Sequence, residues 1–193
     1  MAKDLERELT TLEYLVLGLI SMEPQSGYSI ISTFESGRYR WSGSPGSVYP
    51  ILKRLEKQRI LVSELEVVHE TRPRKIYSLA PLGEEILDDW LRSPLTRNEV
   101  MVERDLVLMK FLFAERRLSR QEVLAWLDAY AEETENYHSF FSISPPLYGD
   151  DDPDIVQHRT PHTKLINEAV HMELSMQREW IKLAKEQLTD TGQ

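Results

Sequence analysis

The sequence has no cysteine among its 193 residues. This absence excludes disulfide bonds, thiolate catalysis and zinc or iron–sulfur sites held by cysteine, and we expect an intracellular, cytoplasmic protein. No apolar run approaches the roughly 20 residues that a membrane-spanning helix needs. The first residues, MAKDLERE, are charged where a signal peptide is apolar. We therefore expect no membrane partner.

Catalytic and metal-binding motifs are lacking as well. The chain has no Gly-rich phosphate loop, no Gly-x-Ser-x-Gly elbow, no His-Glu-x-x-His pair and no kinase signature, so we expect neither an enzyme nor a cofactor. His158 and His162 have the spacing of two metal ligands on a helix, but Pro161 lies between them. The acidic run Asp150 to Asp152 with Asp154 lacks the glycine and the terminal glutamate of a calcium loop, so we expect no metal site.

Charge is unevenly distributed along the chain. The formal net charge is −9, and residues 93–193 carry −7 of it. Residues 38–75 instead hold nine basic and four acidic side chains, a net charge of +5. A basic island of this kind is typical of a nucleic-acid-binding surface, with a solvated charged face as the alternative. Its place in the fold decides between the two.

Residues 1–93 predict a winged helix-turn-helix domain. Apolar side chains at helical spacing indicate a helix over residues 12–20. Ser26 is a cap for a second helix that ends at Gly37, and Ser44 followed by Pro45 opens a third helix that runs to about residue 58. Runs rich in Val, Ile, Leu and Tyr at 61–68 and 75–79 predict a β-hairpin with a basic tip, and a further helix at 82–91 ends before Pro94. The fold class is therefore mainly α with a small β-hairpin wing.

Residues 94–193 predict an α-helical domain. We expect helices at 100–114, from a capping box at 119–122 to about 141, and at 163–188, with a loop over 144–161. The last helix carries more apolar residues than one small bundle needs, which favours dimerisation. Aromatic side chains of this half are candidates for the pocket of a small aromatic effector, with core packing as the alternative. They are Trp126, Tyr130, Tyr137, Phe140 and Trp180.

Four segments of the first half resemble the PadR family of bacterial transcriptional regulators. They are TLEYLVLGLI at residues 11–20, SGYSI at 26–30, GSPGSVYPILKRLE at 43–56, and RKIYSL at 74–79 followed by Gly83. The string Pro-Gly-Ser-x-Tyr-Pro-x-Leu-x-x-Leu-Glu is the most specific of these. The second half resembles the C-terminal dimerisation region of that family in pattern and length only.

The resemblance implies a homodimeric repressor that binds double-stranded DNA at a pseudo-palindromic operator, packed through its last and first helices. The third helix would enter the major groove and the wing would touch the flanking DNA. On this reading the DNA-binding residues are Tyr28, Ser44, Gly46, Ser47, Tyr49, Pro50, Lys53, Arg54, Arg72, Arg74 and Lys75. The resemblance carries no catalytic residue and no metal.

Two points leave alternatives open. Tyr49 and Pro50 also suit a purely structural role in the third helix, and the whole domain also suits a protein-interaction adaptor without sequence-specific DNA binding. The sequence also departs from the family where Arg59 stands in place of the usual glycine after the third helix. If Arg59 adopts the left-handed conformation there, the strain is about 1 kcal/mol.

Overall fold

The computed structural model describes residues 8–36, 43–67, 73–143 and 161–190. The chain folds into two compact units, residues 1–93 with 105–119, and residues 94–104 with 120–193. Three sequence expectations fall outside the described residues: the helix end at Gly37, the wing-tip residue Arg72 and almost all of the loop at 144–161. No helix in the described ranges is long and apolar enough to cross a membrane.

The first unit begins with two helices that the sequence predicted. Helix α1 spans Thr11–Met22, and its start is fixed by a capping box in which the Thr10 backbone N–H donates to the Glu13 carboxylate at 2.7 Å. Helix α2 spans Gly27–Glu35 and is capped by Ser26, whose hydroxyl accepts from the Ser29 N–H at 3.1 Å. Two N-terminal caps, Thr10 and the predicted Ser26, therefore set where these helices begin.

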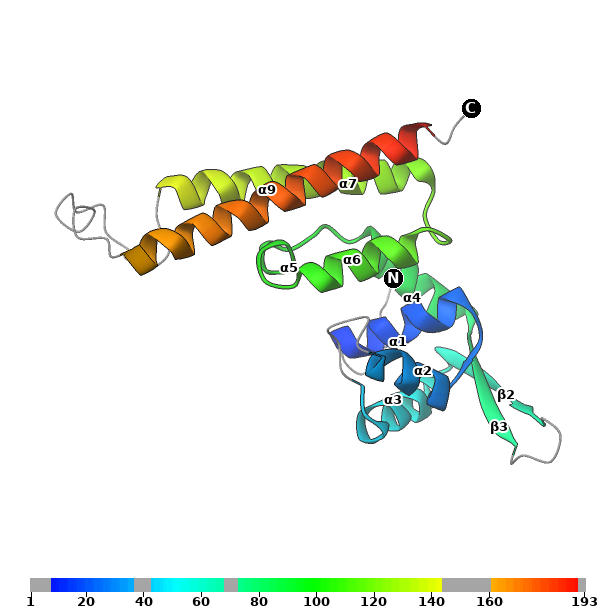
Figure 1. Ribbon diagram of the computed structural model, residues 1–193. Coiled ribbons are helices and arrows are strands. Elements are labelled where there is room, and N and C mark those ends of the chain that lie inside the picture. The colour runs from blue at the N-terminus through cyan, green and yellow to red at the C-terminus, as the bar shows by residue number, and fades with distance from the viewer. Residues whose placement is uncertain (1–7, 37–42, 68–72, 144–160, 191–193) are drawn as a thin grey trace. The chain divides into compact units, whose positions relative to one another are not determined.

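The third helix and the wing follow in the predicted order (Figure 1). Helix α3 spans Pro45–Lys57, strand β2 spans Leu61–Glu66 and strand β3 spans Arg74–Leu79. The strands are antiparallel, with Leu61 opposite Leu79 and Glu66 opposite Arg74. The sequence missed strand β1, Gln25–Ser26, which pairs with β3 on its other edge. Two residues are too few for an alternating pattern, so only long-range pairing reveals that strand.

The core of the first unit combines all of these elements. Leucines from α1, α3 and α4 (Pro81–Arg92) are fully or almost fully buried together, and Met109 and Phe113 from α6 (Arg104–Ala114) join them. Gly83 on α4 allows close approach, because a Cβ there would lie 2.2 Å from the Ile60 carbonyl oxygen. This packing fixes α3 and the base of the wing in one body.

One predicted helix is wrong in its extent. The sequence predicted a single helix over 100–114, but α5 spans Arg97–Met101 and α6 restarts at Arg104. The break at Val102 lies next to the point where the chain passes from the second unit to the first. Val100 is buried in the second unit, whereas Leu106 is buried in the core of the first.

The second unit is built on two long antiparallel helices, α7 (Arg120–Ile143) and α9 (Pro161–Asp190), which lie side by side in Figure 1. Ion pairs between Lys185 and Asp128 and between Arg178 and Glu135 follow this antiparallel register. The buried side chains recur at spacings of four and three on both helices, which is the spacing of one helical face. They are Val123, Leu127, Tyr130 and Thr134 on α7, and Leu174, Gln177 and Ile181 on α9.

Candidate nucleic-acid interface

The N-terminus of α3 presents two serines and a glycine on the surface. The Ser44 N–H donates to the Ser47 hydroxyl at 3.0 Å, and that hydroxyl donates to the Ser44 carbonyl at 3.0 Å. Ser44 and Gly46 are exposed, and among the described residues a Cβ on Gly46 would meet only the Ser44 hydroxyl oxygen, at 3.7 Å. Packing against this part of the chain therefore does not require glycine at residue 46. The helix start leaves N–H groups that suit a phosphate oxygen.

Pro50 lies inside α3 and is exposed. Because proline has no N–H, the Gly46 carbonyl cannot accept the usual bond from residue 50. The exposed face of the helix thus holds a backbone acceptor next to the serine hydroxyls.

The two predicted aromatic residues lie on different parts of this surface. Tyr28 on α2 is 75% exposed and Tyr49 on α3 is 49% exposed. The Tyr49 ring also packs over α2, since a Cβ on Gly27 would lie 2.6 Å from it. Tyr49 therefore has a structural contact and an exposed part, which suits both sequence interpretations of this residue.

The cations of α3 differ in their surroundings. Lys53 is exposed and has no ion pair or hydrogen bond within the described ranges. Arg54 is half-buried and forms an ion pair with Glu13 of α1, whose side chain is fully buried. A buried carboxylate needs a cation beside it, so Arg54 supports the contact between α1 and α3.

The cations of the wing are paired within the protein as well. The Arg74 Nε lies 2.5 Å from the Glu66 carboxylate on the neighbouring strand. The Lys75 ammonium donates to both Glu56 carboxylate oxygens, at 2.8 and 2.9 Å. The hydrogen bond from Lys75, followed by that from Ser63, lowers the pKa of Glu56, and the bond to Glu56 raises the pKa of Lys75.

A hollow of about 440 Å³ lies between α2 and the wing, and sequence reasoning missed most of its residues. It is lined by hydroxyl side chains and by the Arg74 guanidinium. The hydroxyl residues are Ser26, Tyr28, Ser29, Ser32, Thr33 and Ser36. The signal was present, since Ser29, Ser32 and Ser36 recur at helical spacing on the side of α2 away from its buried isoleucines. Hydroxyls beside a guanidinium can hold a phosphate group.

The predicted aromatic effector residues lie in the second unit. Tyr130 lies between two tryptophans: its ring centroid is 5.8 Å from that of Trp126 and 6.3 Å from that of Trp180. Tyr130 is 1% exposed, and burial raises its pKa to about 12. Arg97 lies over the half-buried Tyr137 ring, and the Phe140 side chain lies outside the described residues. The three neighbouring rings form part of the contact between α7 and α9.

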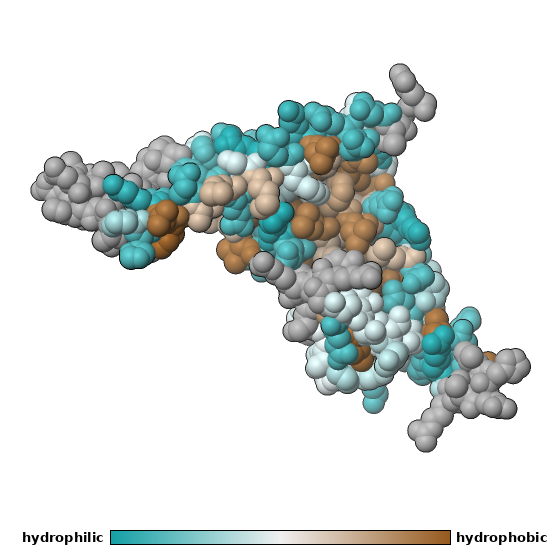
Figure 2. All heavy atoms as spheres, viewed as in Figure 1, coloured by the Kyte–Doolittle hydropathy of each residue, from teal (hydrophilic) through white to brown (hydrophobic). Residues whose placement is uncertain are grey.

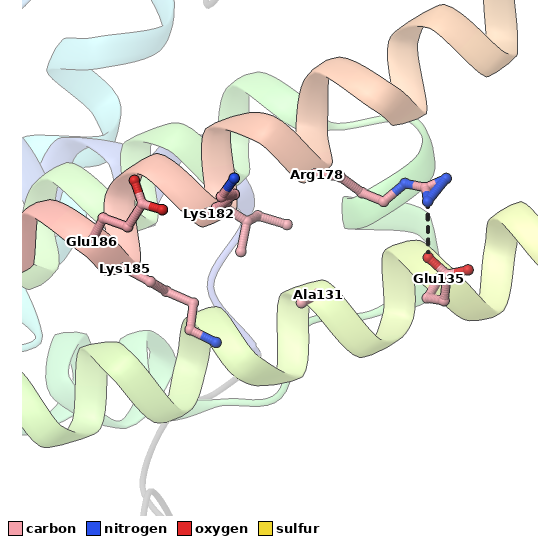
Figure 3. A pocket seen from close by; sticks show the side chains of 7 residues that line it. Ala131, Glu135, Arg178, Lys182, Lys185 and Glu186 are labelled. Carbon is pink, nitrogen blue, oxygen red and sulfur yellow. Dashed lines mark ion pairs between the residues drawn. The ribbon is translucent and has the colours of Figure 1, made fainter. Parts of the chain in front are cut away.

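A separate hollow of about 510 Å³ lies between α7 and α9, and none of the predicted aromatic residues with a described side chain lines it (Figure 3). Its lining includes Ala131 and Ile181. The Arg178–Glu135 ion pair, at 3.3 Å, and Lys182 line it as well. The arrangement offers apolar contact together with charged groups. Among the described residues, no group of three or more potential metal ligands occurs.

Comparison with known proteins finds relatives of the winged-helix part of this chain. A family model described as "Transcriptional regulator PadR-like family" matches residues 16–89. The chain is 32% identical over 118 residues to "Negative transcriptional regulator PadR" of Bacillus subtilis, which covers 59% of this chain and 62% of that protein. It is 42% identical over 57 residues to "Transcriptional regulator Rv3488" of Mycobacterium tuberculosis, covering 30% of this chain and 52% of that protein. The chain thus spans less than two thirds of either relative.

Two solved structures are among those similar to this chain, both with TM-scores below 0.5. One is Bacillus subtilis PadR in complex with operator DNA, at 22% identity and a TM-score of 0.42, covering 93% of this chain and 99% of that chain. The other is a PadR family transcriptional regulator from Eggerthella lenta, at 30% identity and a TM-score of 0.38, covering 42% of this chain and 68% of that chain. The family match covers residues 16–89, the part of the chain that folds as the winged helix, and this part is similar to the PadR-like family of transcriptional regulators.

Proposed function

We propose that this protein is a DNA-binding repressor that recognises a pseudo-palindromic operator as a homodimer. The observation that carries the proposal is the surface of the first unit, where the exposed start of α3 and the Arg74-lined hydroxyl hollow belong to one compact body. The name of the Bacillus subtilis relative, a negative transcriptional regulator, supports the direction of regulation.

The residues of this surface suit two different roles in DNA binding, contact with phosphates and contact with base edges. Cations and hydroxyls that neutralise or bind phosphates supply affinity without sequence information, and hydroxyls or rings that reach base edges supply selectivity. Lys53 and the hydroxyl hollow suit the first role. Ser47 and Tyr49 at the start of α3 suit the second, if α3 enters the major groove.

The homodimer part of the proposal is supported by a second apolar stripe on α9. Leu165, Met172 and Met176 are 66%, 66% and 43% exposed, and Leu183 is 54% exposed. With Ala169 they recur at spacings of four, three, four and seven, which is the repeat of a helix–helix seam. This stripe lies away from the face of α9 that packs on α7, and Figure 2 shows apolar side chains at the surface over these helices. A second copy of the chain is the occupant we propose.

A dimer contact through helix α1 has less support than one through α9, because residues 15–20 of α1 are buried in the core of the first unit. Release by a small aromatic effector stays a prediction, with the rings around Tyr130 and the hollow between α7 and α9 as the two places to test. A cytoplasmic location also stays a prediction.

The experiment has two steps. The wild-type protein selects duplexes from a random-sequence pool, and fluorescence anisotropy then compares the selected duplex with a scrambled one at two salt concentrations. We expect tighter binding of the selected duplex at a stoichiometry of two chains, and equal binding of both duplexes would favour the adaptor alternative. Lys53→Ala and Arg74→Ala should each weaken binding roughly three- to tenfold without changing the unfolding midpoint. Lys164→Ala on α9 removes the same charge from the second unit and should leave binding unchanged.

A further inference from the structure

Glu56 connects three elements of the proposed DNA-binding surface. It lies in the last turn of α3, and its carboxylate accepts two hydrogen bonds from Lys75 on β3, at 2.8 and 2.9 Å. The same carboxylate accepts a third bond, at 2.5 Å, from the Ser63 hydroxyl on β2. One side chain thus ties the recognition helix to both strands of the wing.

The wing is anchored to the unit at its base and by β1, which pairs with Ile76 and Tyr77 of β3. At the base the Ala80 N–H donates to the Ile60 carbonyl at 3.0 Å, and Ile60 and Leu61 are buried in the core. Farther along, the side chains of β2 lose their core contacts, since Leu65 is 69% exposed. Lys75 lies opposite Leu65, in this outer part of the hairpin. Apolar burial therefore does not hold the outer wing, and a polar tie has most effect there.

We propose that Glu56 is a positioning residue that fixes the angle of the wing against α3, and that Lys75 acts through Glu56 and not as a phosphate ligand. The inference rests on the proposed DNA-binding function and changes the role of one residue in it. A cation held by two bonds to a carboxylate gains little from moving to a phosphate, because it must first give up that partner. The charge of the pair as a whole is close to zero, so its value to DNA binding lies in geometry.

One substitution, Glu56→Gln, separates this role from simple electrostatics, because the two explanations predict opposite changes in DNA affinity. Glu56→Gln removes a negative charge from a surface that faces phosphates, so electrostatics alone makes binding tighter, by roughly twofold. Loss of wing position makes binding weaker instead. We expect Glu56→Gln to weaken binding of the selected duplex about fivefold or more. Glu64→Gln is the matched control, because Glu64 is exposed on β2 and has no ion pair within the described ranges. It should bind as tightly as the wild type or slightly more tightly.

A charge reversal tests the assignment of Lys75. The double variant Glu56→Lys with Lys75→Glu keeps the pair and the net charge, so we expect binding within about threefold of the wild type. If Lys75 instead binds a phosphate, the reversal places a carboxylate against DNA and binding falls below that of Lys75→Met. That result, or tighter binding by Glu56→Gln, overturns the inference.

Hydrogen exchange without DNA gives a readout that does not depend on the proposed function. Backbone amides of residues 74–76 should exchange faster in Glu56→Gln than in the wild type and Glu64→Gln, and the double variant should restore protection. Unchanged exchange in Glu56→Gln overturns the inference even if binding weakens. If the wild type shows no selectivity between duplexes, the proposed function fails, and the exchange experiment still decides whether Glu56 holds the wing. Thermal unfolding of each variant confirms that the unit is folded at the assay temperature.

Discussion

Arg59 gives a stability prediction that depends on one backbone angle. Its φ is +59°, the only positive value at a non-glycine residue in the described ranges, and it lies just after the end of α3. The Arg59 N–H donates to the Glu56 carbonyl at 3.0 Å, and the Ile60 N–H donates to the Leu55 carbonyl at 2.9 Å. These bonds close the helix and require the left-handed conformation. The side chain itself is exposed.

The change in the free energy of unfolding for Arg59→Gly is the difference between relieved backbone strain and gained freedom of the unfolded chain. Replacing Arg59 with glycine relieves a left-handed strain of about 1 kcal/mol or slightly more. Glycine gains more freedom in the unfolded chain, which offsets about 0.5 kcal/mol of that. We therefore expect Arg59→Gly to raise the free energy of unfolding by roughly 0.5 kcal/mol, a shift of about 1 to 2 °C in the unfolding midpoint.

The assay compares neighbouring positions, because a small single shift is hard to interpret. Gln58 has a φ of −80°, where glycine relieves nothing, so Gln58→Gly should destabilise the unit by about 0.5 to 1 kcal/mol. Arg59→Ala keeps the strain and loses only the charge, so its midpoint should stay near that of the wild type. Urea unfolding followed by circular dichroism measures all three. If Arg59→Gly is less stable than Arg59→Ala, the backbone argument is refuted.

Three further outcomes are expected. Gly83→Ala should destabilise the first unit by about 2 kcal/mol in urea unfolding, because the new Cβ would lie 2.2 Å from the Ile60 carbonyl oxygen, and a wild-type midpoint would contradict that packing. Because burial raises the pKa of Tyr130 to about 12, its contribution to stability is fully present below pH 10 and is lost between pH 10 and 12. Tyr130→Phe should lack this part of the pH dependence, and equal profiles for the two proteins would exclude it. If Lys53, Arg54, Arg72, Arg74 and Lys75 each released a counterion, the logarithm of the binding constant would fall with log salt at a slope of about −4.5 per subunit. If Arg54 and Lys75 stay in their internal ion pairs, three cations remain and the slope is about −2.7.

Local signals explain how much of the fold the sequence predicted. Ser26, Ser44 and Pro94 mark helix ends through interactions within a few residues, and those ends are confirmed. Strand β1 and the break at Val102 depend instead on partners far along the chain. A run of helix-forming residues does not reveal that residues 100 and 106 enter different cores. The left-handed Arg59 was predictable because a glycine was expected there.

The residues of the candidate site were predictable from the sequence, but their contacts were not. A cation is visible in the sequence, but the group that it contacts is not, and the carboxylates that hold Arg54, Arg74 and Lys75 come from α1, β2 and α3. The basic island and these carboxylates form three ion pairs, so three of the predicted DNA ligands are paired within the unit. Arg54 and Lys75 stabilise the arrangement of helix and wing, whereas Lys53, which is outside these pairs, and Arg74, which lines the hydroxyl hollow, suit phosphates. The count of charges therefore finds the surface, but the contacts of each cation decide which residue we propose to bind DNA and which one to position the residues that do.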